Sequence, residues 1–233
     1  MPVNYFTMNS LAEENYLKAI YQIAESGDGY ITTNDIARKI RTTPASVTDM
    51  LKKLSKKKLI KYRKYNGLSM TEAGKKVALN IIRKHRLWEM FLVKILKFKW
   101  DEVHEMAEQL EHIRSEILVQ HIDKVLRYPK FDPHGDPIPD SHGKFVLSKE
   151  KSFQLSDGKQ ERTYIMNGVI DHSISFLQLL DKSGLVLGSR IKIKYVQPYD
   201  KSLSVLHNGK KKLFISNQIA KNILVSNAGS RKK

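Results

Sequence analysis

The sequence contains no cysteine among its 233 residues. Disulfide bonds and thiolate ligands are therefore excluded, and a transition-metal site must use imidazole, carboxylate, amide, thioether or backbone oxygen donors. No apolar run approaches the roughly 20 residues that a membrane-spanning helix needs. The opening MPVNYFTMNSLAEEN lacks a basic stretch followed by an apolar core, so we expect a cytoplasmic protein without a secretory signal.

Acidic residues are scarce relative to basic ones. The chain has 41 Lys and Arg against 24 Asp and Glu, which gives a net charge of +17. The excess is uneven: residues 1–75 carry 13 basic and 7 acidic side chains, residues 76–145 carry 12 and 11, and residues 146–233 carry 16 and 6. A polyanionic partner such as nucleic acid commonly accompanies such an excess, and a generally basic surface is the alternative.

The first 70 residues have the pattern of a winged helix-turn-helix. A capping box at 10–13 predicts one helix, and TTNDIARKI at 32–40 predicts a second. Thr43 is placed to cap a third helix, with Pro44 in its first turn. The Asn-Gly pair at 66–67 then indicates a tight hairpin turn, which would form the wing.

The third predicted helix has the composition of a DNA-reading element. Short side chains in its first turn can contact base edges in the major groove. Eight basic residues and no acidic one lie between Lys52 and Lys64, where they can neutralise phosphates. The alternative is a solvated basic face. The predicted contact residues are Thr43, Ala45, Ser46, Thr48, Asp49, Lys52, Lys53, Lys56 and Lys64.

The middle of the chain is predicted to be helical and the last third to be β-rich. Thr71 and Asp101 are placed to cap two long helices, 71–96 and 101–126, apolar enough to form a core and a dimer interface. Residues 128–144 are rich in Pro and Gly, as at a domain boundary. The segments KSFQLSD, TYIMNGVI, RIKIKYVQ, SLSVLH and KLFIS beyond it have the character of strands in a small barrel.

Histidine and glutamate recur on the two long helices. His104, Glu108, Glu111 and His112 stand at i, i+4, i+7 and i+8, so on one helix they would share a stripe. On the preceding helix, His85 and Glu89 stand at i, i+4. If the helices pack side by side, the six side chains can converge on manganese, ferrous iron, zinc or nickel. Each pair is equally consistent with an exposed, mildly favourable contact.

Three other function classes fit parts of the pattern. HEMAE at 104–108 is similar to the H-E-x-x-H helix of zinc hydrolases, but Glu108 holds the second histidine position. The sequence also has neither a cysteine nucleophile nor a recognisable phosphate-binding glycine loop, which disfavours a metallohydrolase. A metal-independent DNA-binding protein would leave the His/Glu stripe as a solvated face. A metal storage protein would leave the basic third helix unexplained.

The motifs RKHRLWEMFL, EVHEMAEQLEH and DPHGDPIP resemble the diphtheria-toxin-repressor family of iron- and manganese-dependent regulators, as do ASVTDMLKKLSKKKLI and YNGLSMTEAGKK. The resemblance runs from about residue 10 to 225. It implies a multidomain fold, mainly α with a C-terminal β part. The expected domains are a winged helix-turn-helix at 1–72, a helical dimerisation and metal-binding domain at 73–145, and an SH3-like barrel of the ferrous-iron-transport A type at 146–228.

The resemblance also assigns roles to residues. His85, Glu89 and His104 would form an ancillary metal site, with His172 as a substitute ligand from the barrel. Glu108, Glu111 and His112 would form the regulatory site with Asn15, which stands where iron sensors have Met and manganese sensors Asp. Glu108 replaces the Cys typical of iron sensors, and its harder oxygen ligand favours Mn²⁺ over softer competitors, with Fe²⁺ as the alternative. Lys18 stands where some manganese sensors have a further Glu, which argues against a second ion close by.

The function implied is a repressor of metal-uptake genes. Metal would link the first helix to the two long helices and fix the angle of the winged domain. Two recognition helices of a homodimer would then fit half-sites of palindromic double-stranded DNA. The metal must bind the DNA-competent arrangement more tightly, because otherwise it shifts no population.

Overall fold

A computed structural model describes residues 9–26, 31–63, 67–145 and 151–229. The chain divides into two compact units, which we describe separately. The first comprises residues 1–88, 107–128 and 138–145, and the second comprises 89–106, 129–137 and 146–233. In the described part of the chain, no helix is both long and apolar enough to cross a membrane.

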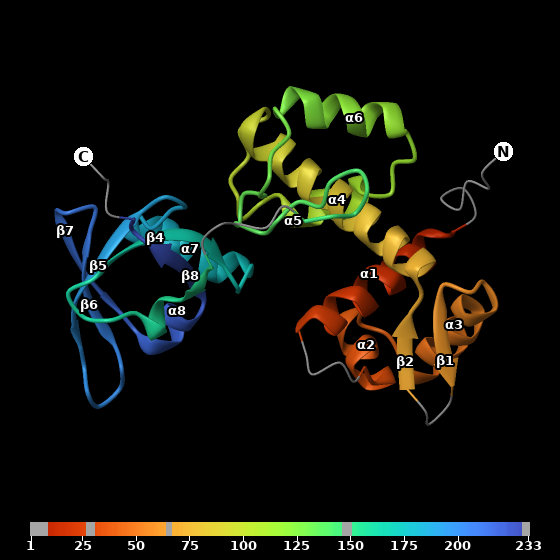
Figure 1. Cartoon of the computed structure of the whole chain (residues 1–233), viewed down its shortest axis with the longest axis horizontal. Coiled ribbons are helices and arrows are strands. Elements are labelled where there is room, and N and C mark those ends of the chain that lie inside the picture. Colours follow the sequence, from red (N-terminus) through yellow and green to blue (C-terminus); the bar gives the residue numbers. More distant parts are fainter. Residues whose placement is uncertain (1–8, 27–30, 64–66, 146–150, 230–233) are drawn as a thin grey trace. The chain divides into compact units, whose positions relative to one another are not determined.

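The first unit begins with a winged helix-turn-helix. Helices α1 (Leu11–Ser26), α2 (Thr33–Lys39) and α3 (Pro44–Lys56) precede the antiparallel hairpin of β1 (Ile60–Arg63) and β2 (Gly67–Met70). Figure 1 shows the hairpin beside α3, as expected for a wing next to a recognition helix. Asn66 of the predicted turn lies outside the described residues, and Gly67 enters β2 with a φ of 98°.

The predicted caps of these helices are confirmed. At the start of α1, the Ser10 backbone N–H donates to Glu13 Oε2 over 2.7 Å and the Glu13 N–H donates to Ser10 Oγ over 3.3 Å. Thr43 Oγ1 accepts from the backbone of Ser46, with Pro44 at the first helical position. Each bond satisfies an N–H group that has no partner within its helix.

The core of the winged domain comes from the apolar faces of its three helices. In α3, the side chains at i, i+4 and i+7 are fully buried, which is the spacing of one helical face. Leu17 and Ile20 of α1 pack into the same core. The buried residues of α3 are Val47, Leu51 and Leu54. Burying this face leaves the opposite, polar face of α3 available to a ligand.

Helix α4 (Glu72–Lys94) begins as predicted, with Thr71 Oγ1 accepting from the Gly74 N–H over 3.1 Å. The single helix predicted for 101–126 is wrong. Instead, α5 spans His104–Leu110 and α6 spans Glu116–Val125. The break arises because Ser115 caps a new helix, accepting from the Leu118 N–H over 3.2 Å. Ser, with a short hydroxyl, favours such a cap over a helix interior.

The second unit contains a six-stranded antiparallel sheet in the order β3-β8-β4-β5-β6-β7. Its core is formed by the inward residues of the strands and by two helices that the sequence analysis did not predict. All five predicted strand segments are confirmed, and β8 is an additional strand. The elements are β3 (Phe153–Gln154), β4 (Thr163–Val169), α7 (Ile174–Ser183), β5 (Arg190–Val196), β6 (Leu203–His207), β7 (Lys211–Ile215), α8 (Asn217–Lys221) and β8 (Ile223–Asn227).

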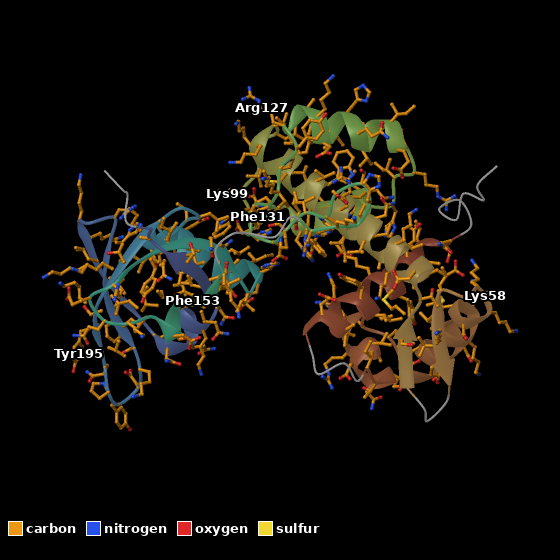
Figure 2. The ribbon with its side chains drawn as sticks, in the orientation of Figure 1. Lys58, Lys99, Arg127, Phe131, Phe153 and Tyr195 are labelled. Carbon is orange, nitrogen blue, oxygen red and sulfur yellow. The ribbon has the colours of Figure 1, made fainter. Side chains whose placement is uncertain are left out.

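Helix α7 has clear local causes. Phe176, Leu177 and Leu180 supply its buried face. Gly184 ends the helix in the left-handed conformation, with a φ of 78°, which a glycine adopts without steric cost. Tyr195 of β5 is exposed and projects to solvent, as Figure 2 shows.

Candidate metal centre

The first cluster of candidate ligands lies in the first unit and comprises His85, Glu108 and Glu111. His85 comes from α4, Glu108 from α5, and Glu111 from the turn directly after α5. One donor atom from each of the three lies within 4.8 Å of the others. His85 Nδ1 is 2.6 Å from Glu111 Oε2, and the Glu111 side chain is fully buried. The sequence analysis assigns His85 to the set with Glu89 and His104, and its Nδ1 also contacts Glu111.

Lys18 of α1 points into this first cluster. Its Nζ donates to Glu111 Oε2 over 2.6 Å and to Glu108 Oε1 over 2.7 Å, and it lies 3.3 Å from His85 Nδ1. The Lys18 residue is only 6% exposed. A buried ammonium needs charge partners, and the two carboxylates supply them.

His112 lies beside the first cluster and is bound to α1. Its Nδ1 is 2.7 Å from Glu14 Oε2, so the Nδ1–H donates to the carboxylate, and in the neutral tautomer this leaves the lone pair on Nε2. That Nε2 lies 3.8 Å from Glu111 Oε1. A carboxylate that orients a ligating imidazole in this way is common around protein metal ions.

Two buried side-chain oxygen atoms around the first cluster are unsatisfied. Within the described residues, neither Glu111 Oε1 nor Asn15 Oδ1 has a hydrogen-bond partner. Buried polar atoms are normally paired, so a ligand could pair with the Glu111 oxygen beside His112 Nε2 and with the Asn15 oxygen in the pocket that Lys18 and Glu108 also line. Oxygen and imidazole donors suit Mn²⁺ and Fe²⁺, so the residues present fit the metal that the sequence predicts.

The second cluster lies in the second unit and comprises Glu89, Asp132 and His134, all buried. Their donor atoms also lie within 4.8 Å of one another. His134 Nδ1 is 3.6 Å from Glu89 Oε2, and the predicted ligand His104 has its Nδ1 3.4 Å from Glu89 Oε1. Gly135 keeps the loop close to β4, because a Cβ there would lie 2.2 Å from the Asn167 carbonyl oxygen.

Charge and stacking fix the His134 ring. Burial opposes its protonation, but the hydrogen bond and charge of Glu89, helped by Asp132, raise the pKa of His134 to about 9. The predicted ligand His172 stacks on His134, with ring centroids 4.7 Å apart. Burial lowers the pKa of His172, and the neighbouring His134 charge acts in the same direction. His172 Nε2 is 3.3 Å from the Val169 carbonyl oxygen.

The sequence analysis did not single out Asp132 and His134 as ligands. Both lie in the Pro- and Gly-rich segment, more than 40 residues after Glu89, where no helical spacing connects them to it. The available signal is the segment DPHGDPIP, which contains both residues and contributes to the family resemblance. A histidine and an aspartate two positions apart in a glycine-containing loop can both face one ligand.

The polar face of α3 presents most of the predicted DNA contacts to solvent. Ala45, Ser46 and Asp49 are exposed and Thr48 is half-buried. The predicted phosphate contacts Lys52, Lys53 and Lys56 are exposed as well, whereas Lys64 lies outside the described residues. Figure 2 shows Lys58 just beyond α3, on the same side of the domain.

Helix α1 also contacts the recognition helix. The buried Glu13 carboxylate accepts from Lys57 Nζ over 2.8 Å and forms an ion pair with Lys53 over 3.3 Å. These ion pairs and hydrogen bonds hold the pKa of Glu13 below its ordinary value, although burial acts in the opposite direction. Glu13 is followed directly by Glu14, so adjacent residues of one helix contact the C-terminal end of α3 and His112.

Comparison with known proteins identifies three matching regions. Residues 9–68 match "Iron dependent repressor, N-terminal DNA binding domain", residues 71–140 match "Iron dependent repressor, metal binding and dimerisation domain", and residues 153–227 match "FeoA domain". The regulator MntR of Bacillus subtilis is 33% identical over 121 residues, which are 52% of this chain and 84% of MntR. The chain belongs to the diphtheria-toxin-repressor family.

Other relatives agree with that membership. The iron-dependent repressor IdeR of Mycobacterium tuberculosis is 34% identical over 134 residues, which are 57% of this chain. The match spans only 58% of the length of IdeR. A solved manganese-dependent transcriptional repressor in complex with manganese superposes with a TM-score of 0.81, at 29% identity over 92% of this chain and 99% of that structure. ScaR with bound Cd²⁺ gives 0.73 at 33% identity over 92% and 99%.

The family membership confirms several expectations. The fold class is confirmed, with a helical DNA-binding and dimerisation region followed by an antiparallel β domain of the FeoA type. The relatives are named as repressors and regulators, so the metallohydrolase alternative is not supported. The manganese and iron named among these diphtheria-toxin-repressor relatives are the two metals that the sequence analysis predicts.

Proposed function

We propose that this protein is a metal-dependent transcriptional repressor that binds duplex operator DNA when Mn²⁺ is bound, with Fe²⁺ as the alternative metal. One observation carries the proposal: α1 bridges the ligand cluster and the recognition helix. Its Glu14 binds His112 over 2.7 Å, and its Glu13 binds Lys57, the residue that caps the C-terminal end of α3, over 2.8 Å. A cation that changes the position of α1 therefore also changes the position of the recognition helix α3.

The regulatory ion would be held by Glu111 Oε1, His112 Nε2 and Asn15 Oδ1, with Glu108 at the edge of the set. The ion supplies a divalent positive charge that pairs with the buried carboxylates. A second ion would be held in the second unit by Glu89, Asp132 and His134, with His104 and His172 adjacent. These donors are hard oxygens and imidazoles, as Mn²⁺ and Fe²⁺ prefer.

A homodimer would bring two recognition helices to a palindromic site. Support comes from α6 and the turn after it, where four large apolar side chains are at least one-third exposed: Ile117, Leu118, Val125 and Tyr128. A second copy that covers these side chains would remove them from water, as in the interfaces of stable dimers. Two recognition helices about 34 Å apart would fit successive major grooves.

The experiment begins with a duplex selected from a random library by the full chain in Mn²⁺. Fluorescence anisotropy of that duplex is then measured anaerobically with Mn²⁺, Fe²⁺, Zn²⁺ or Co²⁺, and again with excess chelator. We expect Mn²⁺ or Fe²⁺ to tighten binding at least tenfold and the chelator to reverse the effect. The same metal should then bind more tightly with operator present, because the coupling is reciprocal.

A pair of histidine variants serves as the control. His112→Ala removes an imidazole of the proposed site and should abolish the metal response. His142→Ala removes an exposed imidazole outside both ligand clusters and outside α6, and should keep it. Equal DNA affinity with metal and with chelator in the wild-type protein would contradict the proposal.

A metal-independent DNA-binding protein is the second candidate, and Lys18 favours it. Its ammonium already links α1 to Glu108 and Glu111 without a metal ion. In that case the chelator would leave operator binding unchanged, while Lys18→Ala would weaken it. The anisotropy measurement on the wild-type protein separates the two candidates.

A further inference from the structure

We propose that the Lys18 ammonium takes the position of one divalent cation in the first cluster, so that this part of the chain holds one metal ion where its ligands could hold two. The inference deepens the proposed function and rests on it for the cluster's role as a metal site. It concerns the number of ions and the state of the protein without metal, which the proposed function leaves open.

The ammonium has the contacts of a central cation. Lys18 Nζ lies 2.6 Å from Glu111 Oε2, 2.7 Å from Glu108 Oε1 and 3.3 Å from His85 Nδ1. These are three donors of metal-ligand type, from two chain segments outside α1. Because ligands about 2.1–2.2 Å from an ion lie roughly 3–4.4 Å apart, donor atoms within 4.8 Å of one another could also surround a divalent ion. The ammonium and that ion cannot share one position.

The charges of Glu108 and Glu111 explain why a cation is favoured between them. The Glu111 side chain is fully buried and its Oε2 also contacts His85, so this carboxylate has no access to water. Glu108, whose side chain is 41% exposed, brings a second carboxylate oxygen within 4.8 Å of Glu111, and the two carboxylates repel unless a cation lies between them. Lys18 supplies that cation from within the chain. The pair formed with Glu111 is buried on both sides, with side-chain exposures of 8% and 0%.

The remaining donors define where a metal ion can still bind. Lys18 uses Oε2 of Glu111, whereas Oε1 of the same carboxylate is buried and finds no hydrogen-bond partner in the part of the chain that the structure describes. Asn15 Oδ1 is in the same condition, and His112 Nε2 lies 3.8 Å from Glu111 Oε1. The ammonium and one divalent ion can therefore bind opposite oxygens of Glu111.

This arrangement has a consequence for the metal-free protein. Through Lys18, α1 is fastened to Glu108 and Glu111 before any ion binds. Metal then adds a second link through Asn15 and His112, rather than creating the first link. The metal response of DNA binding is accordingly smaller than it would be if α1 were free in the metal-free state.

The test counts Mn²⁺ ions per chain by equilibrium dialysis and metal analysis of the full-length protein. Lys18→Ala vacates the three-donor position and Lys18→Glu adds a carboxylate to it, so each should bind about one more Mn²⁺ than the wild-type protein. Lys18→Arg keeps a cation and should bind the wild-type number. Lys57→Ala, which removes another lysine from a buried carboxylate, is the matched control and should also show no gain.

Hydrogen exchange of the α1 amides in chelator gives a second readout. Lys18→Ala should exchange about tenfold faster than wild type, Lys18→Arg should stay near wild type, and Mn²⁺ should restore protection in Lys18→Ala. If Lys18→Ala and Lys18→Glu bind no additional ion, the inference is overturned. It is also overturned if the wild-type protein binds as many ions as they do, because Lys18 would then move aside for metal.

Failure of the proposed function gives a different pattern. The operator affinity of the wild-type protein would not change with Mn²⁺. Lys18→Ala would still bind one more ion if the ammonium occupies the three-donor position of the first cluster. Conversely, a normal metal response with no change of ion number in the Lys18 variants would preserve the function and reject the inference. The anisotropy and dialysis measurements therefore test the two statements separately.

Discussion

Glu14 and His112 are joined by a 2.7 Å hydrogen bond between Oε2 and Nδ1, which connects α1 to the turn after α5. The bond sets the tautomer of His112 and directs Nε2 toward Glu111 Oε1, 3.8 Å away. Neighbours that orient a metal-ligating imidazole commonly contribute 10- to 100-fold to metal affinity. Weakening this hydrogen bond therefore tests whether His112 is a metal ligand.

Glu14→Gln is expected to weaken Mn²⁺ binding at the His112 site by roughly 10- to 100-fold, because the amide is a poorer acceptor and leaves the imidazole less basic. Isothermal titration with Mn²⁺ measures the change. The control is Glu25→Gln, an exposed glutamate near the end of the same helix. A wild-type affinity in Glu14→Gln would show that His112 is not held for metal by this carboxylate.

Lys52 and Lys56 are expected to contact DNA phosphates, because both are exposed on the polar face of α3. Replacing each with Gln should lower the slope of log affinity against log salt by about 0.9 per lysine. Binding to operator and to unrelated duplex should weaken alike, since phosphate contacts carry no sequence information. Lys182→Gln, on α7 in the other unit, is the control, and its slope should match wild type.

Arg83 and Asp123 form a nearly buried ion pair between α4 and α6, with Nη2 and Oδ2 2.6 Å apart. Arg83 also donates to the Pro139 carbonyl oxygen over 2.6 Å. Arg83→Met should lower the free energy of unfolding by about 3–5 kcal/mol, because it leaves the Asp123 carboxylate buried without its partner. Urea denaturation in chelator measures this loss. The double variant Arg83→Met/Asp123→Asn should recover part of it, and no recovery would mean that packing, not charge, is lost.

The parts of the fold that follow from local sequence were predicted well. Capping boxes and a Pro at the first helical position depend only on neighbours within four residues, so Ser10, Glu13 and Thr43 were assigned correctly. The break after α5 was missed because the helical period of His and Glu continues through it. Only Ser115, which favours a helix start, contradicts that period.

The candidate site shows the same division between local and distant contacts. Helical spacing found His85, Glu108 and Glu111, although their mutual contacts depend on packing between helices rather than on spacing. Asp132 and His134 were not found as ligands, because a loop has no period that relates it to Glu89. The family resemblance places Lys18 beside the regulatory site, but its contact with both carboxylates depends on packing between helices, for which the sequence has no local signal.

Asp35 completes the capping box of α2, accepting from Thr32 Oγ1 over 2.6 Å and from its backbone N–H over 3.3 Å. The side-chain and backbone hydrogen bonds from Thr32 lower the pKa of Asp35. Because the folded pKa lies below the unfolded value of about 3.9, the carboxylate's stabilisation is complete above pH 3.9 and disappears as pH falls through the folded pKa. Asp35→Asn should therefore unfold at lower urea concentration than wild type at pH 7, and the two midpoints should converge in that acid window. Circular dichroism at several pH values measures the convergence, and a constant difference down to the lowest pH would show that the charge of Asp35 contributes nothing.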